Sequence, residues 1–275
     1  MDDFAEKTNQ ELAAQRAQRD IDYVEYDKAG RIWGLFPRER ITTISFPRID
    51  KSIIKEFSEM QDLSSSVSDV LDSFGTRGAV ASSHVKPVIP GKQIVGQAVT
   101  IRSIPERKTA TQGYNDKDFI RMVTRDMYYI AEEGDVVIAD FGGNLNVSNM
   151  GGQSCSVAKS CGMAGSIVNG AVRDVGMIKE LDYPVWSCGT TPMTGKFRMR
   201  AIEINGPVTL HDILIMPGDL IVADDSGVCT IPYELVEKVL EKLKSILKAE
   251  EHMRTLIFDK KPLDELRPLY RQRYK

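Results

Sequence analysis

The stretch Gly162-Met-Ala-Gly-Ser-Ile-Val-Asn-Gly-Ala-Val-Arg-Asp174 decides the fold class. Its residues 166–168 form a short apolar run, which is typical of a strand that is buried on both faces. Similar runs occupy residues 136–139 and 184–186, and short helices are predicted between the runs at about 154–161 and 175–181. This alternation of strand and helix is a βαβα pattern, so the sequence predicts an α/β fold.

On the N-terminal side, residues 1–47 are predicted to form an extension. Residues 3–28 are polar and helix-prone with few apolar positions, which indicates an exposed or partner-docked helix and not a core element. Trp33, Phe36 and the β-branched run 41–44 follow, and they suggest that the extension packs on something, such as a neighbouring subunit. Asp50 is a good N-cap for a helix that runs to Met60.

The rest of the pattern gives a main domain at residues 48–258 and a C-terminal tail at 259–275. The serines at 64–66 are expected to break the first helix, and Gly75 is expected to end a second helix at 67–74. A helix is predicted at 116–132 and a long amphipathic helix at 235–256. Strands are predicted at 85–89, 93–104, 201–204, 208–215, 220–223 and 228–231.

Composition limits the function classes. The chain has 275 residues, 42% of them hydrophobic and 27% charged, as in ordinary globular proteins. Its net charge of −3 and its lack of a basic stripe argue against nucleic-acid binding. Without a bilayer-length apolar run or a secretory signal, a cytoplasmic protein is expected. The four cysteines form no CxxC pair and no histidine lies near Cys155 or Cys161, so zinc binding is not favoured.

A glycine loop is the first candidate for chemistry. Gly151-Gly152 precede a short helix that starts with Gln153-Ser154. Free N–H groups at a helix start, with the positive end of the helix dipole behind them, bind carboxylate or phosphate. Glycine also lets a ligand approach the backbone closely. A plain tight turn between strand and helix is the alternative.

The pair Arg173-Asp174 is the second candidate. It follows the turn dipeptide Asn169-Gly170 after a buried strand. Arg173 can bind a carboxylate through two hydrogen bonds, and Asp174 can supply an oxygen to Mg²⁺ or Mn²⁺. Two alternatives stay open: Asp174 as the N-cap of the next helix, and Arg173 in a surface salt bridge. For Glu250 and Glu251 on the last long helix, a solvated helix face is the default interpretation.

Several motifs together resemble the RraA-like family, which includes 4-hydroxy-4-methyl-2-oxoglutarate / 4-carboxy-4-hydroxy-2-oxoadipate aldolases and regulators of ribonuclease E activity. The resemblance runs in consistent order from about residue 50 to 256. Its motifs are Gly96-Gln-Ala-Val-Thr-Ile, Gly134-Asp-Val-Val-Ile-Ala-Asp, the stretch from Gly162 to Asp174, Leu181-Asp-Tyr-Pro-Val-Trp, Gly189-Thr-Thr-Pro and Pro217-Gly-Asp-Leu-Ile-Val-Ala-Asp-Asp-Ser-Gly-Val.

The resemblance implies a swivelling β/β/α-type (RraA-like) domain that carries the N-terminal helical extension, assembled as a homotrimer or homohexamer with active sites between subunits. It also implies a divalent-metal lyase that acts on a small carboxylate substrate. The N–H groups of residues 151–154 (Gly151, Gly152, Gln153, Ser154) and Arg173 would then bind the substrate carboxylate. Asp174 would ligate Mg²⁺ or Mn²⁺, and Glu251 or Glu250 of an adjacent subunit would join the catalytic groups.

The sequence departs from the aldolase pattern of this family at one position. In that pattern an acidic residue and twenty further residues precede Arg-Asp, and here the acidic position is Gly152. Three functions follow: a related lyase with its base elsewhere, a 2-oxo acid decarboxylase, or a protein that has lost catalysis. The leading hypothesis is a metal-dependent lyase on a small oxo- or hydroxy-acid, and the alternative is a regulatory or binding protein. Substrate specificity is expected to lie in loop side chains such as Asn144, Asn149 and Gln153.

Overall fold

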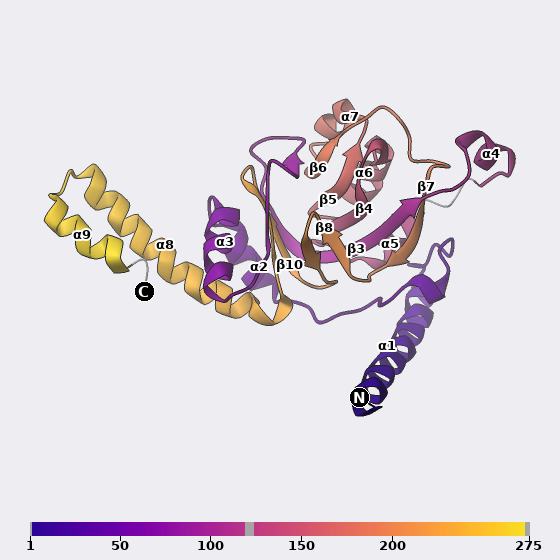
Figure 1. Cartoon of the computed structure of the whole chain (residues 1–275), viewed down its shortest axis with the longest axis horizontal. Helices are drawn as coiled ribbons and strands as arrows, with labels where there is room; N and C mark the ends of the chain where they lie inside the picture. Colours follow the sequence, from indigo (N-terminus) through magenta and orange to yellow (C-terminus); the bar gives the residue numbers. More distant parts are fainter. Residues whose placement is uncertain (1, 119–123, 273–275) are drawn as a thin grey trace.

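The computed structural model describes residues 2–118 and 124–272 (Figure 1). Within these residues, nine strands form one sheet in the order β1-β11-β10-β3-β4-β5-β6-β2, and β7 pairs with the far part of β3. The strands are β1 Ala79–Ala81, β2 Lys86–Pro87, β3 Ile94–Pro105, β4 Val136–Met150, β5 Gly165–Val172, β6 Val185–Thr190, β7 Met199–Ile204, β10 Leu220–Ala223 and β11 Gly227–Ile231. A separate hairpin consists of β8 Val208–Leu210 and β9 Ile213–Ile215.

The centre of the sheet is parallel, because β3, β4, β5 and β6 run in the same direction. Alternate side chains of these strands enter different cores, as the pleat of a strand requires. Val137 and Ala139 of β4 face a core with α5 (Thr124–Ile130), α6 (Gly152–Ser160) and α7 (Val175–Glu180). Val136 and Ile138 face the opposite core, which the β8–β9 hairpin covers. The three predicted buried runs and the α/β fold are therefore confirmed.

A third core lies where the antiparallel end of the sheet meets three helices. These are α2 (Lys51–Ser58), α3 (Leu63–Ser73) and the first turns of α8 (Val236–Phe258). Asp50 caps α2 as predicted, since its side chain accepts a hydrogen bond from the N–H of Ser52 at 2.7 Å. Gly75 follows α3 with a φ of +68°, a left-handed conformation that glycine adopts without strain.

The N-terminal extension packs on its own chain. Its helix α1 (Asp2–Lys28) was predicted, and the 3₁₀ turn Arg38–Arg40 comes later in the segment. Phe36, Ile41 and Ile44 are at most 3% exposed and belong to the core beneath α5 and α6. Trp33 stays 43% exposed and stacks on Tyr129. The segment 29–47 thus completes the fold of the same subunit, whereas contact with a neighbouring subunit stays a prediction.

Some predicted elements were wrong in their bounds. The serines 64–66 lie inside α3 and do not break a helix. The predicted strand 208–215 is the β8–β9 hairpin, because its polar dipeptide His211-Asp212 forms the turn, and only Lys86–Pro87 of the predicted strand 85–89 pairs. Of the helix predicted at 116–132, residues 124–130 form α5, residues 119–123 lie outside the described residues, and the short helix α4 (Ala110–Asn115) precedes them.

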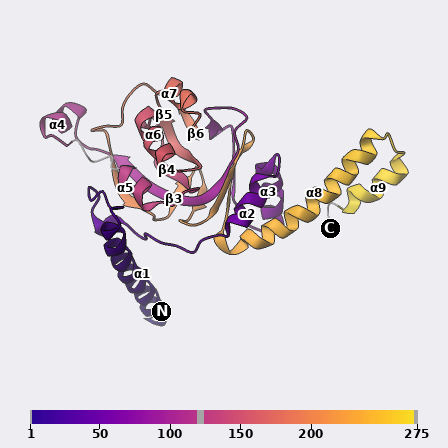
Figure 2. The same ribbon diagram turned by 180° about the vertical axis from the view of Figure 1, so that it is seen from behind.

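Two helical elements project from the body of the molecule at separate places. Figures 1 and 2 show α8 with α9 (Leu263–Gln272), which folds back beside it, at one end of the long axis, and α1 projecting below the sheet. The predicted C-terminal tail therefore contains a helix. A short 3₁₀ turn, Tyr233–Leu235, leads into α8. Of the helices in residues 2–118 and 124–272, none combines the length and the apolar character that crossing a membrane requires.

Candidate functional site

The glycine loop joins β4 to α6. β4 ends at Met150, and Gly151 occupies the N-cap position of α6 with extended backbone angles (φ −150°, ψ −170°). The first hydrogen bond of the helix runs from the N–H of Cys155 to the carbonyl of Gly151 at 3.0 Å. The N–H groups of Gln153 and Ser154 therefore lie in the first turn, ahead of any intrahelical acceptor. A glycine at the N-cap brings no side chain of its own to this helix end.

The pair Arg173-Asp174 lies directly against this helix end. Asp174 follows β5 in a left-handed conformation (φ +55°), and its Oδ2 atom accepts a hydrogen bond from the N–H of Gly152 at 3.1 Å. The N–H of Arg173 donates to the carbonyl of Met150 at 3.0 Å. The guanidinium Nε of Arg173 is 3.5 Å from Asp174 Oδ2, and the two side chains are 40% and 46% exposed. A cationic group, a carboxylate and a helix N-terminus thus meet at the surface.

Gly151 is required for this close approach. A Cβ atom at this position would lie 2.6 Å from Oδ2 of Asp174 and 2.9 Å from Cγ of Arg173. Both distances are shorter than van der Waals contact. Any larger residue would therefore push Arg173 and Asp174 away from the start of α6.

The structure bears on both alternatives that the sequence left open. Asp174 does occupy the N-cap position of α7, but its side chain makes no capping hydrogen bond to that helix. Its carboxylate instead accepts a hydrogen bond from the N–H of Gly152 at the start of α6. The salt bridge of Arg173 is formed with Asp174 itself. Both residues are therefore directed at the predicted anion loop.

Met177 is a site residue that the sequence did not reveal. A Cβ atom on Gly152 would lie 2.1 Å from Sδ and 2.7 Å from Cγ of Met177, so this side chain fills the space beside the glycine. Met177 is nevertheless 46% exposed and thus forms part of the site surface. Its position in the first turn of α7, three residues after Asp174, is the only signal in the sequence that would have suggested it.

Asn149 is the second unusual feature. It is 3% exposed, and among the residues that the structure describes neither its Oδ1 nor its Nδ2 atom has a hydrogen-bond partner. Buried amides are normally paired, and an unpaired one costs free energy. Its place, two residues before the N-cap of α6, agrees with the prediction that this loop contains polar side chains near the site.

Of the remaining predicted residues, Gln153 and Ser154 lie at the site and Glu251 does not. The side chain of Gln153 is exposed and that of Ser154 is half-buried on the first turn of α6. Glu251 is not brought to the site within one chain. It lies fifteen residues into α8, roughly 22 Å along the helix axis from its start, and pairs with Arg254. Glu251 could reach a site only in another subunit, so its role stays a prediction.

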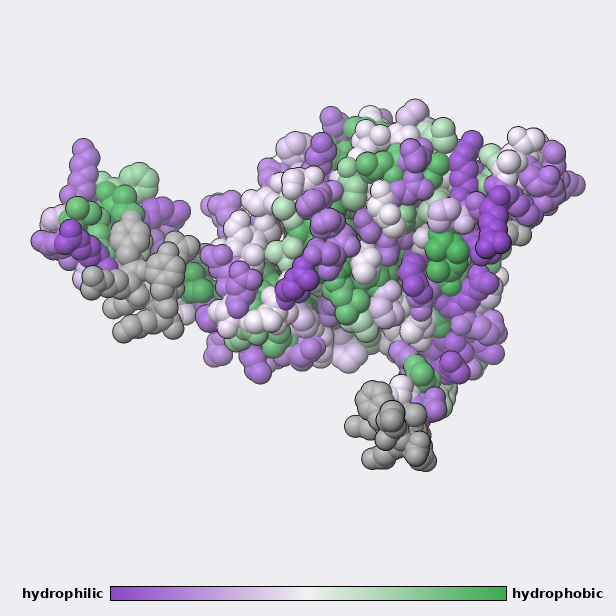
Figure 3. All heavy atoms as spheres, viewed as in Figure 1, coloured by the Kyte–Doolittle hydropathy of each residue, from purple (hydrophilic) through white to green (hydrophobic). Residues whose placement is uncertain are grey.

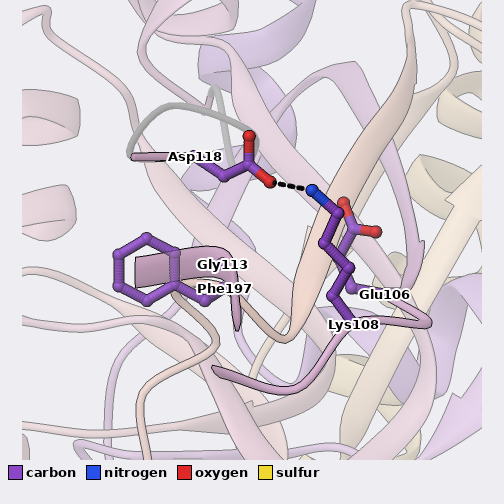
Figure 4. Close-up of a pocket in the computed structure, with 5 residues that line it drawn as sticks. All are labelled: Glu106, Lys108, Gly113, Asp118 and Phe197. Atoms are coloured by element: carbon purple, nitrogen blue, oxygen red, sulfur yellow. Dashed lines mark hydrogen bonds and ion pairs between the residues drawn. The ribbon is translucent and has the colours of Figure 1, made fainter. Parts of the chain in front are cut away.

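Other polar groups take no part in the proposed site. Cys155, beneath the loop, stays a neutral thiol because burial, with help from Asp174, raises its pKa to about 12. Figure 4 shows Lys108 pointing at Asp118 near α4. The cavity that these residues line has a volume of only about 10 Å³, which is too small for a substrate. Within residues 2–118 and 124–272, no group of three or more His, Cys, Asp or Glu side chains is placed to hold a metal ion.

The chain is similar to several known proteins. The family model RraA-like, described as Aldolase/RraA, matches residues 64–230. A protein of Halalkalibacterium halodurans, named provisionally as a 4-hydroxy-4-methyl-2-oxoglutarate aldolase, is 33% identical over 178 residues, which are 65% of this chain and 76% of that protein. Protein DlpA of Legionella pneumophila is 32% identical over 207 residues, which are 75% of this chain but only 32% of that longer protein.

Solved structures share the fold. An uncharacterised protein of Pseudomonas syringae superposes with a TM-score of 0.67 at 24% identity over 81% of this chain and 100% of that chain. RraAS2 of Streptomyces coelicolor, described as an unusual member of the RNase ES inhibitor RraA protein family, superposes with a TM-score of 0.65 at 24% identity over 76% of this chain and 99% of that chain. The matched segment 64–230 includes the glycine loop and the Arg173-Asp174 pair, and this chain belongs to the RraA-like family.

Proposed function

We propose that this protein is a divalent-metal-dependent lyase that acts on a small 2-oxo or hydroxy acid. It would release pyruvate by aldol cleavage, or carbon dioxide by an oxaloacetate-type decarboxylation. One observation carries the proposal: Arg173 and Asp174 are held against the N-terminus of α6, with Asp174 Oδ2 accepting from Gly152 N–H at 3.1 Å. The name of the Halalkalibacterium halodurans relative supports a lyase at the level of the family.

The substrate carboxylate would bind between Arg173 and the start of α6. The guanidinium can donate two parallel hydrogen bonds to a carboxylate. The N–H groups of Gln153 and Ser154 add two donors, and the positive end of the helix dipole favours the negative charge. Because Arg173 is 40% exposed, a ligand can reach it without any change in the fold.

The residues of the site fit a hard divalent cation held mainly by oxygen atoms. Asp174 supplies one carboxylate, which is 46% exposed. Mg²⁺ and Mn²⁺ suit a site with one protein carboxylate, because they keep several waters and accept substrate oxygens as further ligands. When bound, such an ion would supply Lewis-acid stabilisation of negative charge on the substrate. Arg173 would hold the substrate carboxylate beside it.

The thioether of Met177 bears on the type of reaction. The family resemblance places an acidic residue at position 152, and here the space beside Gly152 is filled by Met177, which cannot accept a proton. Aldol cleavage of a hydroxy acid needs a base for the hydroxyl proton, whereas decarboxylation of a 2-oxo acid needs less acid–base help. We therefore propose decarboxylation ahead of aldol cleavage. Because no acidic residue stands at position 152, a non-catalytic regulatory or binding protein is the second candidate function.

The test is pyruvate release from oxaloacetate and from 4-hydroxy-4-methyl-2-oxoglutarate, with Mg²⁺, with Mn²⁺ and with a chelator. The lyase proposal expects release that the chelator abolishes, and it expects oxaloacetate to be the better substrate. Release of pyruvate from neither substrate, by a preparation that binds Mn²⁺, would refute the lyase and favour the regulatory candidate.

Variants of the two site residues make the test specific. Arg173→Ala is expected to raise KM more than it lowers kcat, and Asp174→Ala is expected to abolish metal-dependent turnover. Arg107→Ala and Asp182→Asn are matched controls, because Arg107 is exposed elsewhere and Asp182 has a left-handed conformation like that of Asp174. Both controls should turn over normally. Unchanged turnover in Arg173→Ala and Asp174→Ala would refute the proposed site.

A further inference from the structure

The thioether of Met177 lies against the glycine loop at the start of α6. Met177 belongs to the first turn of α7, and its side chain is 46% exposed. A Cβ atom on Gly152 would lie 2.1 Å from the sulfur, and all three atoms nearest to that position belong to Met177. Because a carbon–carbon bond is about 1.5 Å long, the sulfur lies within about 3.6 Å of Cα of Gly152. An exposed, oxidisable group therefore contacts the loop that is proposed to bind the substrate carboxylate.

The sulfur lies on the side of the helix end to which the free N–H groups point. The Cα–Cβ bonds of a helix tilt toward its N-terminus, so the Cβ position of Gly152 marks that side. The N–H groups of Gln153 and Ser154 point the same way and have no intrahelical acceptor. The N–H of Gly152 already donates to Asp174. An oxygen atom added to the sulfur would therefore face the N–H donors of Gln153 and Ser154.

Met177 is as accessible as methionines elsewhere on the surface. Met193 and Met216 are 47% and 43% exposed, whereas Met150, next to the loop, is 4% exposed. Figure 3 shows hydrophobic side chains among hydrophilic ones at the surface over α6 and α7, near the top of the view. An oxidant in solution can thus reach the sulfur of Met177 without any change in the fold.

The thiol of α6 does not compete with Met177 for an oxidant. Cys155 is 0% exposed, and burial raises the pKa of its thiol to about 12, so it stays neutral. The thiolate is the form of cysteine that oxidants attack. Cys161 and Cys188 are partly exposed, so a test must separate their oxidation from that of Met177.

We propose that Met177 is an oxidative modification site whose sulfoxide closes the glycine loop to carboxylates. Hydrogen peroxide transfers one oxygen atom to the sulfur: the O–O bond breaks, an S–O bond forms, and the second oxygen leaves as water. The sulfur is oxidised by two electrons and the peroxide is reduced by two. The sulfoxide oxygen then accepts a hydrogen bond from the N–H of Gln153 or Ser154, and that donor is no longer free for a substrate.

The change in chemistry at the sulfur is what makes this contact a switch. A thioether is a weak hydrogen-bond acceptor, so reduced Met177 leaves the N–H groups of α6 free. A sulfoxide is polar, and the positive end of the helix dipole favours the partial negative charge on its oxygen. Sulfoxide reductases restore the thioether, so the closed state is reversible.

The switch rests on the proposed function in one respect, the binding of a carboxylate by the glycine loop, and it needs no turnover. The first experiment therefore measures binding. Calorimetry gives the Kd of the full-length protein for pyruvate with Mg²⁺, before and after treatment with hydrogen peroxide, and peptide mass spectrometry locates the added oxygen. Oxidation of Met177 is expected to raise the Kd by about tenfold or more, because a hydrogen bond to a charged group is lost.

The second experiment detects the new hydrogen bond and supplies the controls. Amide hydrogen exchange of the peptide that contains residues 152–155 should slow after oxidation, because a bonded N–H exchanges more slowly than a free one. Met177→Leu keeps the side-chain volume and all four cysteines, so peroxide should change neither its exchange nor its Kd. Met216→Leu removes an equally exposed methionine away from the loop and should respond to peroxide as the wild type does.

Four results would overturn the switch: Met177 stays unmodified while Met216 is oxidised; the Kd for pyruvate is unchanged once Met177 carries the oxygen; the Kd rises equally in Met177→Leu; or the reduced protein binds no pyruvate, so that there is no site to close. Failure of the proposed lyase gives a different result. Pyruvate then binds and oxidation of Met177 weakens it, but neither oxaloacetate nor 4-hydroxy-4-methyl-2-oxoglutarate is turned over.

Discussion

At the scale of single residues, Gly152 and Met177 form a coupled pair. An added Cβ at position 152 would lie 2.1 Å from the sulfur, 2.7 Å from Cγ and 2.9 Å from Cβ of Met177, so the whole methionine would have to move. We expect Gly152→Ala to lower the free energy of unfolding by about 1 kcal/mol or more, as overpacking does. In a Met177→Ala background the same change should cost less, because the contacts with the sulfur and Cγ are gone and only the 2.9 Å contact with the Cβ of residue 177 remains.

A double-mutant cycle measured by urea denaturation checks this expectation. The coupling free energy between the two positions should be about 0.5–3 kcal/mol, the range for residues in contact. Gly176→Ala is the matched control, because no atom lies within 4 Å of a Cβ at that position. A cost of Gly152→Ala that is the same with and without Met177 would mean that the methionine does not fill this space.

Asp219 gives the stability of the protein a specific pH dependence. Its side chain is 7% exposed, and burial raises its pKa to about 6. The folded state therefore binds a proton that the unfolded state, with a pKa near 4, has already lost. Protonation of Asp219 thus stabilises the fold below about pH 4, and this contribution is lost as the pH rises through about 6.

Comparison of the wild type with Asp219→Asn isolates this effect. Between pH 4 and 7 the free energy of unfolding of the wild type should fall relative to that of the variant, by up to about 3 kcal/mol. Asp182→Asn should give no such slope between pH 4 and 7 and the opposite slope below about pH 4, because the hydrogen bond and ion pair with Lys92 lower the pKa of Asp182. Parallel curves for the wild type and Asp219→Asn would contradict the raised pKa.

At the scale of elements, Arg31 connects the extension to the end of α5. Its guanidinium donates to the carbonyls of Tyr129 at 2.9 Å and Ala131 at 2.7 Å and to the carboxylate of Glu132 at 2.8 Å. Carbonyls at a helix C-terminus lack intrahelical partners and carry partial negative charge, so a cation there stabilises the helix. We expect Arg31→Ala to lower the free energy of unfolding by about 1–3 kcal/mol.

Arg31→Lys should recover only part of this stability, since an ammonium group keeps the charge but lacks the planar set of donors. Arg107→Ala, at an exposed position, should stay within about 0.5 kcal/mol of the wild type in the same denaturation series. Equal values for Arg31→Ala and Arg107→Ala would show that the contacts of Arg31 add nothing to stability.

The sequence predicted elements well where the local pattern dominates. The buried runs of β4, β5 and β6, the N-cap Asp50 and the C-terminal Gly75 were all read from local signals. The serines 64–66 were misread because a contact distant in sequence decides their structure. The N–H and hydroxyl of Ser64 donate to the carboxylate of Asp224 at 2.8 Å and 2.6 Å. That partner satisfies the start of α3, which a local pattern cannot show.

The candidate site was predictable in part for the same reason. Gly151, Gly152, Arg173 and Asp174 lie in two loops that follow parallel strands, so a strand–loop–helix pattern was enough to bring them together. The thioether of Met177 against Gly152 depends on side-chain packing between α6 and α7, which no spacing rule encodes. Glu251 belongs to a helix that leaves the body, so its partner depends on assembly.

At the scale of the whole molecule, the extension divides into a part that the fold needs and a part that it does not. Phe36, Ile41 and Ile44 are buried in the core beneath α5 and α6, and Ile41 also forms a bridge with Ile204 of β7. Burial of three such side chains is worth about 1.5–3 kcal/mol each. Because the stability of a native domain is about 5–15 kcal/mol in total, loss of all three removes a large share of it.

Two truncations separate these parts. Removal of residues 2–47 should leave a protein that aggregates or shows no cooperative unfolding transition, because it exposes the core around β3 and β7. Removal of residues 2–12 should change the free energy of unfolding by less than about 1 kcal/mol, because Asn9 to Leu12 are exposed and the contacts of Arg19 and Asp22 remain. Circular dichroism with thermal and urea unfolding measures both. A protein without residues 2–47 that unfolds cooperatively at the wild-type midpoint would mean that the segment 29–47 is not part of the core, and that α1 and the loop after it are an appendage of a domain that folds by itself.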